Sequence, residues 1–238
     1  MKIELAGISK VFGRHRALNQ IREEFAPGRV VAVLGLNGAG KSTLLHCLAG
    51  ILSLNEGQVY FDDELFTRER VDLRRRFGFL PDFPIFFPWM NALEHIAMLL
   101  RLYGKDAPGA EERVLELLRN FDLLPMATAR LATLSRGQIY KVALAGLIAA
   151  EPELWLLDEP MASGMDALGL RELRLRARAA TSAGATILYT TQILSVAEQF
   201  SDEVLILHQG RVHARGPAGS LHASGELEEI MAALREET

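Results

Sequence analysis

A glycine-rich segment in the first fifth of the chain has the residues of a phosphate-binding loop. Residues 35–43 match G-x-x-x-x-G-K-[ST] and follow an apolar run, residues 30–34, that predicts a strand. In such a loop the backbone N–H groups turn towards phosphate oxygens, the lysine supplies positive charge and the serine hydroxyl can ligate Mg²⁺. A helix that begins near Lys41 adds its positive dipole end. The segment predicts a nucleoside triphosphate site formed by Gly35, Leu36, Asn37, Gly38, Ala39, Gly40, Lys41, Ser42 and Thr43.

Two adjacent carboxylates follow a second apolar run. Residues 154–157 are Leu-Trp-Leu-Leu, and Asp158, Glu159 and Pro160 come directly after them. The carboxyl ends of parallel strands face the ligand crevice, so we expect both acids to lie beside the phosphate loop. Asp158 then suits the Mg²⁺ shell, and Glu159 suits a general base for the attacking water. The alternative is an acid pair that only caps the turn before Pro160.

A third motif, Leu134-Ser135-Arg136-Gly137-Gln138, precedes a helical pattern and offers hydroxyl and N–H donors at a second positive helix start. The order of residues 35–43, 134–138, 154–160 and 163–166 resembles the nucleotide-binding subunit of an ABC transporter, and the resemblance runs over essentially the whole chain. A phosphate loop alone would leave kinases and GTPases open. The three motifs together favour the ABC family.

The resemblance implies a role for each matching residue. Phe12 would stack on adenine, although it could instead be a core residue of an N-terminal strand. In the family the 135–138 signature contacts the γ-phosphate of ATP held by the other subunit, and the loop containing Asp166 crosses the dimer interface. The implied ATP-binding residues outside the phosphate loop are Phe12, Ser135, Gly137, Gln138 and Asp166. The implied catalytic residues are Glu159, Lys41, Gln192 and Asp82, and the implied magnesium ligands are Ser42, Asp82 and Asp158.

Two positions depart from the family pattern. The family usually has glutamine at position 82, whereas this chain has Asp82, a good Mg²⁺ ligand that adds negative charge and lacks the amide donor. The family usually places a histidine that hydrogen-bonds the γ-phosphate at the position of Gln192. A glutamine amide can donate to a phosphate oxygen but cannot become cationic. We therefore expect ATP hydrolysis to be slow because of Asp82 and Gln192.

The hydrophobic periodicity predicts the elements that must position these residues. Strand-like pieces fill residues 1–34 and 57–61, amphipathic helices are expected within residues 92–100, 114–118, 138–150 and 226–234, and strands within residues 154–157, 186–190 and 203–207. The fold class is α/β, a P-loop NTPase core with a mainly parallel sheet, an N-terminal antiparallel β part and a helical insertion. We expect one ABC-type ATPase domain over residues 1–238, with residues 1–82 and 135–238 as the β and RecA-like core and residues 83–134 as the helical subdomain.

Two short segments outside the motifs have distinctive compositions. Residues 83–89 read Phe-Pro-Ile-Phe-Phe-Pro-Trp and are too aromatic for a free loop. In the family this region receives a helix of the membrane subunit, so we expect an exposed docking patch; the alternative is that the aromatics cover the subdomain core. Arg74, Arg75 and Arg76 are flanked by acids and are read as a solvated face rather than a nucleic-acid contact.

Composition limits the partners of the protein. The chain has 238 residues, 49% of them hydrophobic, a net charge of −4 and a single cysteine. This mild acidity argues against broad nucleic-acid binding, and the apolar runs are too short to span a bilayer. No secretion signal is evident, and one cysteine fits a reducing compartment. We expect a cytoplasmic protein, peripheral on the cytoplasmic face of the cell membrane.

The expected activity is hydrolysis of ATP to ADP and phosphate with Mg²⁺ as cofactor. The expected partners are a second copy or a homologous ATPase subunit, together with integral membrane permease subunits, with no nucleic acid. The short insertion and the Leu80-Pro81-acid sequence favour an exporter-type system. Two alternatives stay open: a non-transport member of the same family, and an ATP-gated switch subunit that hydrolyses weakly. Substrate and direction are not encoded in these motifs.

Overall fold

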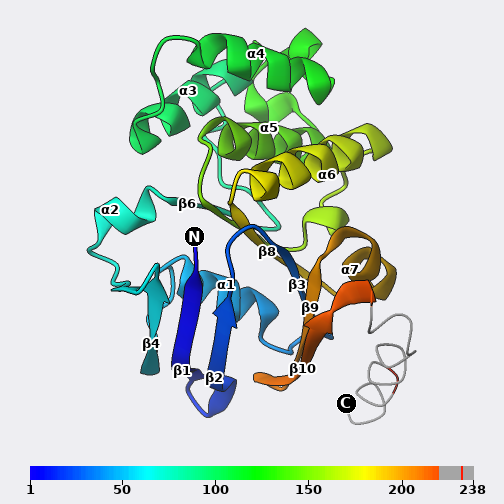
Figure 1. Cartoon of the computed structure of the whole chain (residues 1–238). Helices are drawn as coiled ribbons and strands as arrows, with labels where there is room; N and C mark the ends of the chain where they lie inside the picture. The colour runs from blue at the N-terminus through cyan, green and yellow to red at the C-terminus, as the bar shows by residue number, and fades with distance from the viewer. Residues whose placement is uncertain (220–231, 233–238) are drawn as a thin grey trace.

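The structure is a computed structural model that describes residues 1–219 and residue 232 (Figure 1). The helix predicted over residues 226–234 lies outside the described residues, Ala232 excepted. Within the described part, an antiparallel N-terminal sheet and a helical layer lie on opposite sides of a larger, mainly parallel sheet. This arrangement confirms the predicted fold class.

The larger sheet contains the strands that carry the motifs. Its order is β10-β9-β3-β8-β7-β6, in which β9, β3, β8, β7 and β6 run parallel and β10 is antiparallel to β9. The bounds are β3 Val30–Leu34, β6 Phe77–Leu80, β7 Leu154–Leu157, β8 Thr186–Thr191, β9 Glu203–His208 and β10 Arg211–Pro217. The strand β3 is buried over its whole length between β8 and β9, as its unbroken apolar sequence requires.

The smaller sheet has the order β2-β1-β4-β5 and is antiparallel. Its strands are β1 Ile3–Phe12, β2 His15–Phe25, β4 Glu56–Phe61 and β5 Glu64–Leu65. The predicted β-rich opening is correct, but the long hairpin of β1 and β2 was not resolved by the sequence pattern. This sheet, α1 (Lys41–Leu48) and one face of the parallel sheet enclose the first hydrophobic core, which contains Val31 and Val33.

The helical layer covers the other face of the parallel sheet. Figure 1 shows α3 to α6 gathered at one end of the molecule, and Val30, Ala32 and Leu34 of β3 face the core beneath this layer. The remaining helices are α2 Val71–Arg74, α3 Ala92–Tyr103, α4 Ala110–Asn120, α5 Arg136–Ala149, α6 Ala167–Ser182 and α7 Leu194–Phe200, with short 3₁₀ turns at Leu124–Met126, Leu131–Thr133 and Pro160–Ala162. Among the described helices, none is both long and apolar enough to cross a membrane.

Local sequence signals fix where two of these helices begin. Asn91 and Glu94 form a capping box at the start of α3, and Gly104, in the left-handed region at φ 66°, ends the helix. Ser135 and Gln138 form a second capping box, so α5 begins at Arg136, two residues before the predicted start. Capping boxes satisfy backbone N–H groups that the first turn leaves unpaired, which is why these residue pairs set the boundaries.

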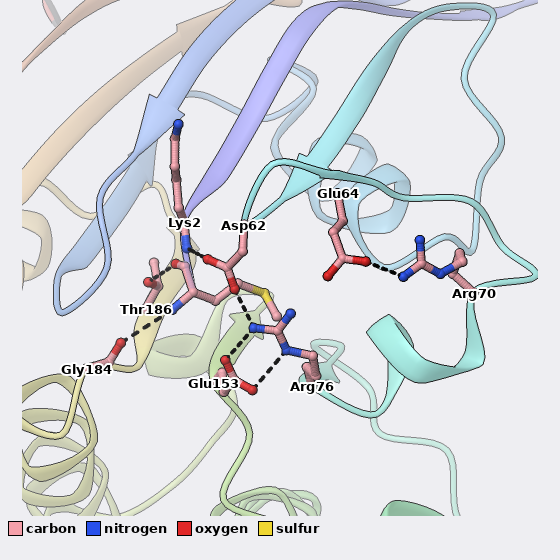
Figure 2. Close-up of polar contacts among 9 residues, drawn as sticks. Lys2, Asp62, Glu64, Arg70, Arg76, Glu153, Gly184 and Thr186 are labelled. Carbon is pink, nitrogen blue, oxygen red and sulfur yellow. Dashed lines mark hydrogen bonds and ion pairs between the residues drawn. The ribbon is translucent and has the colours of Figure 1, made fainter.

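Arg76 ties the two sheets together. It follows α2 and binds Asp62 at the end of β4, and it also donates to Glu153 before β7 at 2.9 and 2.7 Å (Figure 2). The same Asp62 carboxylate accepts a hydrogen bond from the Lys2 backbone at 2.7 Å. The prediction of a solvated arginine run therefore holds for Arg74 and Arg75, which are exposed, and is wrong for Arg76.

Arg76→Ala should lower the free energy of unfolding by about 1 kcal/mol, a modest loss because both ion pairs are partly exposed. The Arg76 hydrogen bond lowers the pKa of Glu153 below its ordinary value. This stabilisation is therefore present above the ordinary glutamate pKa and is lost as the pH falls through the lowered pKa. Urea unfolding at neutral pH and in acid measures both effects. The matched control is Arg75→Ala; an equal loss in the control would contradict the prediction.

Candidate functional site

The phosphate loop joins β3 to α1 and is held close to the hairpin strand β2. Gly40 has a φ of 104°, and a side chain there would place a Cβ 2.4 Å from the Ala17 carbonyl oxygen. Only glycine fits a left-handed position with so close a backbone neighbour. The helix α1 therefore begins at Lys41 with its N-terminal N–H groups at the loop.

Lys41 is buried and its ammonium group is directed back onto the loop. The Nζ atom donates to the carbonyl oxygens of Gly35 and Leu36 at 3.0 and 3.2 Å and lies 3.4 Å from Oε1 of Glu159. A buried ammonium must be paired, and these three acceptors pair it. The structure thus joins the first and second motifs through one ion pair.

Asp158 connects the ends of three elements. Its Oδ1 atom accepts from the hydroxyl of Ser42 on α1 at 3.0 Å and from the hydroxyl of Thr190 on β8 at 2.6 Å. The carboxylate is buried, and hydroxyl donors offset the cost of its desolvation. Thr190 is a functional residue that the sequence analysis missed: no motif marks it, and its place depends on the register of β7 against β8.

Glu159 occupies a strained backbone position beside this carboxylate. Its φ is 47°, in the left-handed region, and its backbone N–H donates to the Thr190 hydroxyl at 2.8 Å. The side chain is 18% exposed. Burial raises the pKa of Glu159, Lys41 opposes that rise, and the charges of Asp158 and Asp82 add to it. A partly buried carboxylate with raised proton affinity suits a general base.

Lys41, Ser42 and Glu159 line an open pocket of about 310 Å³ beside the phosphate loop. Phe12 stands on one side of it with 46% of its surface exposed, and Lys10 Nζ lies 5.1 Å from the ring centroid. An exposed ring next to a phosphate loop is available for stacking, which the core alternative does not explain. His15 and Ala17, which the sequence analysis did not single out, line the same pocket because β2 returns directly from Phe12. The lining residues are Phe12, His15, Ala17, Asn37, Gly38, Ala39, Gly40, Lys41, Ser42, Thr43 and Glu159.

The signature residues lie elsewhere, at the start of α5. Ser135 Oγ accepts from the Gln138 backbone N–H at 3.3 Å, and Gln138 Oε1 accepts from the Ser135 backbone N–H at 2.9 Å. Gly137 packs on the loop that contains Asp166: a Cβ at Gly137 would lie 2.2 Å from the Gly164 carbonyl oxygen. In the described structure Ser135, Gly137, Gln138 and Asp166 do not line the phosphate-loop pocket.

Asp166 has two structural contacts. Its side chain caps α6 by accepting from the Gly169 N–H at 2.8 Å, and it accepts from Lys141 Nζ at 2.7 Å. Lys141 is buried and also donates to the Phe121 carbonyl oxygen at 3.0 Å. The lysine thereby links the signature helix, the loop before α6 and the end of α4. Sequence reasoning missed it because a lone lysine in a helix gives no signal.

The two departures from the family pattern lie outside the pocket. Asp82 accepts from Arg136 Nη2 at 2.6 Å, and the Arg136 guanidinium lies 4.1 Å from the centroid of the Phe83 ring. Gln192 is exposed in the turn after β8. The roles of Asp82 towards Mg²⁺ and of Gln192 towards the γ-phosphate stay predictions.

An apolar groove of about 310 Å³ lies where the segment after β6 meets α3 and α5. Within the aromatic segment, the exposed fractions are 66% for Phe83, 90% for Ile85, 42% for Phe87 and 66% for Trp89. Phe86 alone of these aromatics packs against the core. The side chains therefore form a surface patch rather than a cover for the subdomain core.

The comparisons with known proteins agree with this geometry. The family model described as ABC transporter matches residues 18–162. The ABC-type transporter ATP-binding protein EcsA of Bacillus subtilis is 31% identical over 88% of this chain and 85% of its own. The daunorubicin/doxorubicin resistance ATP-binding protein DrrA of Streptomyces peucetius is 33% identical over 93% of this chain and 67% of its own.

Solved structures show the same similarity. An ATP-binding subunit of an ABC transporter superimposes with a TM-score of 0.91 at 29% identity and covers 99% of this chain and 100% of its own. A dimeric ATP-binding cassette in a post-hydrolysis state with ADP and Pi gives a TM-score of 0.80 at 26% identity, over 91% of this chain and 98% of its own. The chain therefore belongs to the ABC transporter family and is an ATP-binding subunit that hydrolyses ATP.

Proposed function

We propose that two copies of this chain, or one copy and a homologous subunit, enclose ATP between them and power transport through separate membrane subunits. The observation that carries the proposal is the joining of the phosphate loop to Asp158 and Glu159 through Ser42 and Lys41. This arrangement places a phosphate cradle, a hard-metal donor set and a base at one pocket.

The residues present fit Mg²⁺. The Ser42 hydroxyl and the Asp158 carboxylate already lie 3.0 Å apart, and both are hard oxygen donors of the kind that Mg²⁺ prefers. Asp82 supplies a further carboxylate on the neighbouring strand end, since β6 pairs with β7. When bound, Mg²⁺ would neutralise charge on the phosphate oxygens. Ser42, Asp158 and Asp82 are the residues that we assign to it.

The chemistry is transfer of the γ-phosphoryl group from ATP to water, with ADP as the leaving group. Glu159 accepts the proton of the attacking water, and Lys41 exchanges its loop carbonyl partners for the β- and γ-phosphate oxygens. Phe12 stacks on the adenine, and the remaining residues of 35–43 cradle the phosphates. Gln192 donates a neutral hydrogen bond to the γ-phosphate in place of a histidine. Positioning and electrostatics supply the catalysis.

Dimer formation is supported by the placement of the signature. Ser135, Gly137, Gln138 and Asp166 do not line the chain's own phosphate-loop pocket, so we propose that they contact ATP held by a second subunit. The relative solved with ADP and Pi is described as dimeric. We assign residues 83–134 to a helical subdomain and residues 1–82 and 135–238 to the core.

The exposed patch of Phe83, Ile85, Phe87 and Trp89 is the proposed docking site for a permease subunit, which would hold the protein at the cytoplasmic face of the membrane. A similar solved protein is described as part of the transporter complex CbiONQ. Relatives named for sulfate/thiosulfate import and for drug resistance both match this chain. The exporter assignment therefore rests on the short helical insertion and the Leu80-Pro81-acid sequence.

A second candidate function is an ATP-gated switch subunit that hydrolyses slowly. It is favoured by one observation, the exposed and neutral Gln192 at the position where the family usually has histidine. The following measurements separate the two functions.

Glu159→Gln should lower ATP turnover by a factor on the order of 10²–10⁴ while ATP binding and ATP-dependent dimerisation persist, because only the proton acceptor is lost. Steady-state phosphate release and size-exclusion chromatography with Mg²⁺-ATP measure the two effects. Glu151→Gln, at an exposed position after α5, is the matched control. Undiminished turnover in Glu159→Gln would rule out Glu159 as the base, and dimerisation of the wild type without turnover would support the switch.

Gln192→His should raise kcat several-fold, because a cationic imidazole makes hydrogen bonds to phosphate roughly twice as strong as those of a neutral amide. The rate of phosphate release at saturating Mg²⁺-ATP measures it. Gln199→His, exposed on α7, should leave kcat unchanged. A fall in kcat on Gln192→His would show that this position does not limit hydrolysis.

Ile85→Asp should reduce retention of the protein on membranes of its own host by about tenfold, since a docked carboxylate would lose its hydration. The ATPase rate of the purified protein should not change. The control is Leu175→Asp, which alters another exposed apolar side chain, on α6. Retention of Ile85→Asp at the control level would exclude this patch as the docking site.

A further inference from the structure

Tyr140 on α5 carries a buried hydroxyl that has no hydrogen-bond partner in the described structure. The residue is 0% exposed. Buried polar groups are usually paired, so an unpaired one requires an explanation. Tyr189 on β8 shows the usual situation: it is equally buried, but its hydroxyl lies 2.7 Å from Ser201 Oγ and donates to the Val196 carbonyl oxygen at 3.3 Å.

The Tyr140 phenol lies within the electrostatic reach of the two aspartates of the site. Burial raises the pKa of its hydroxyl, and the charges of Asp158 and Asp82 raise it further. Both aspartates follow paired strands, since Leu80 at the end of β6 is in register with Leu157 at the end of β7. Tyr140 also lies one helical turn after Arg136 on α5, and Arg136 holds Asp82 at 2.6 Å, so the unpaired donor is on the same side of the helix as the residue that binds this carboxylate.

The two carboxylates differ in how firmly they are held. Asp158 is buried and accepts from Ser42 and Thr190. Asp82 pairs with Arg136, whose side chain is 46% exposed, and an exposed ion pair contributes little stability. Asp82 is therefore the carboxylate that can change its partner at low cost.

The position of Arg136 also favours an exchange of its partner Asp82. It is the first residue of α5, where the helix dipole disfavours a cation, and its present neighbours are Asp82 and the Phe83 ring. In the proposed dimer the phosphates of the second subunit's ATP arrive at this helix start. A phosphate is a stronger partner for a guanidinium than an exposed carboxylate, so its arrival would release Asp82.

We propose that Tyr140 is a positioning residue for ATP hydrolysis: in the nucleotide-loaded subunit, Asp82 leaves Arg136 and accepts a hydrogen bond from the buried Tyr140 hydroxyl. The inference rests on the proposed function of Asp82. It accounts for a carboxylate at position 82, because the tyrosine hydroxyl supplies the donor that an aspartate lacks. It also gives the unpaired hydroxyl a partner in the working state.

Tyr140→Phe tests the proposal, because it removes only the hydroxyl. We expect kcat to fall about tenfold, the effect of losing a hydrogen bond to a charged group, with the KM for ATP unchanged. Without nucleotide, the Tm should be equal to or above that of the wild type, since an unpaired group is lost. In a Glu159→Gln background, the rise in Tm produced by Mg²⁺-ATP should be smaller when Tyr140→Phe is added.

Tyr189→Phe is the matched control, since it removes a buried hydroxyl that is paired with Ser201 and Val196 rather than with a residue of the pocket. It should lower the Tm with and without nucleotide and leave kcat unchanged. If Tyr140→Phe leaves both kcat and the nucleotide-induced rise in Tm unchanged, the proposal is overturned.

A double-mutant cycle identifies the acceptor. In an Asp82→Ala background, Tyr140→Phe should cause no further fall in kcat. A further tenfold fall would show that the hydroxyl acts through another group and would overturn the assignment of Asp82. Full turnover by Glu159→Gln would instead refute the proposed catalytic base, and the nucleotide-induced rise in Tm would still decide the Tyr140 proposal.

Discussion

The Asp158 carboxylate is the constraint on which the site depends. A buried charge must be fully paired, and its pairing with Ser42 and Thr190 joins the start of α1, the end of β7 and the end of β8. Thr190 in turn accepts from the backbone of Glu159 and so fixes the strained turn that presents this base to the pocket. One carboxylate therefore links the residues that we propose as metal donors to the residue that we propose as the base.

The two faces of the parallel sheet carry different parts of the site. The antiparallel sheet and α1 pack on one face and form the nucleotide pocket with Phe12. The helical layer packs on the other face and carries the signature, which close contact between Gly137 and Gly164 and the Lys141–Asp166 ion pair hold against the loop before α6. The signature and the loop form one packed unit that does not line the phosphate-loop pocket, which fits the proposed dimer, and a similar solved cassette is described as dimeric.

The residues around Asp82 and Gln192 help to explain why these two positions depart from the family pattern. Asp82, Arg136 and Phe83 form a contact between the segment after β6 and the start of α5. Tyr140, one turn after Arg136 on α5, has a buried hydroxyl without a partner in the part of the chain that the structure describes. Asp82 lacks the amide donor of a glutamine, but its own chain offers it two partners: Arg136 in this structure and Tyr140 in the proposed working state. Gln192, in contrast, is exposed directly after β8.

The sequence by itself determined the family, because the phosphate loop, the signature and the acid pair occur in the order that the family requires. It also determined the residues of the loop and of the acid pair, because their chemistry requires fixed residue types at short spacing. It also placed β3 and β7, whose unbroken apolar runs suit strands buried on both faces. It could not show Thr190 beside Asp158, Arg76 between the sheets, Lys141 on Asp166 or the unpaired Tyr140, since each contact joins residues far apart in the chain. Strand register and helix packing bring those residues together, and a slip of one residue in β8 would turn Thr190 to the other face. Only the tertiary structure decides such contacts, because they depend on the packing of the whole core rather than on any local pattern.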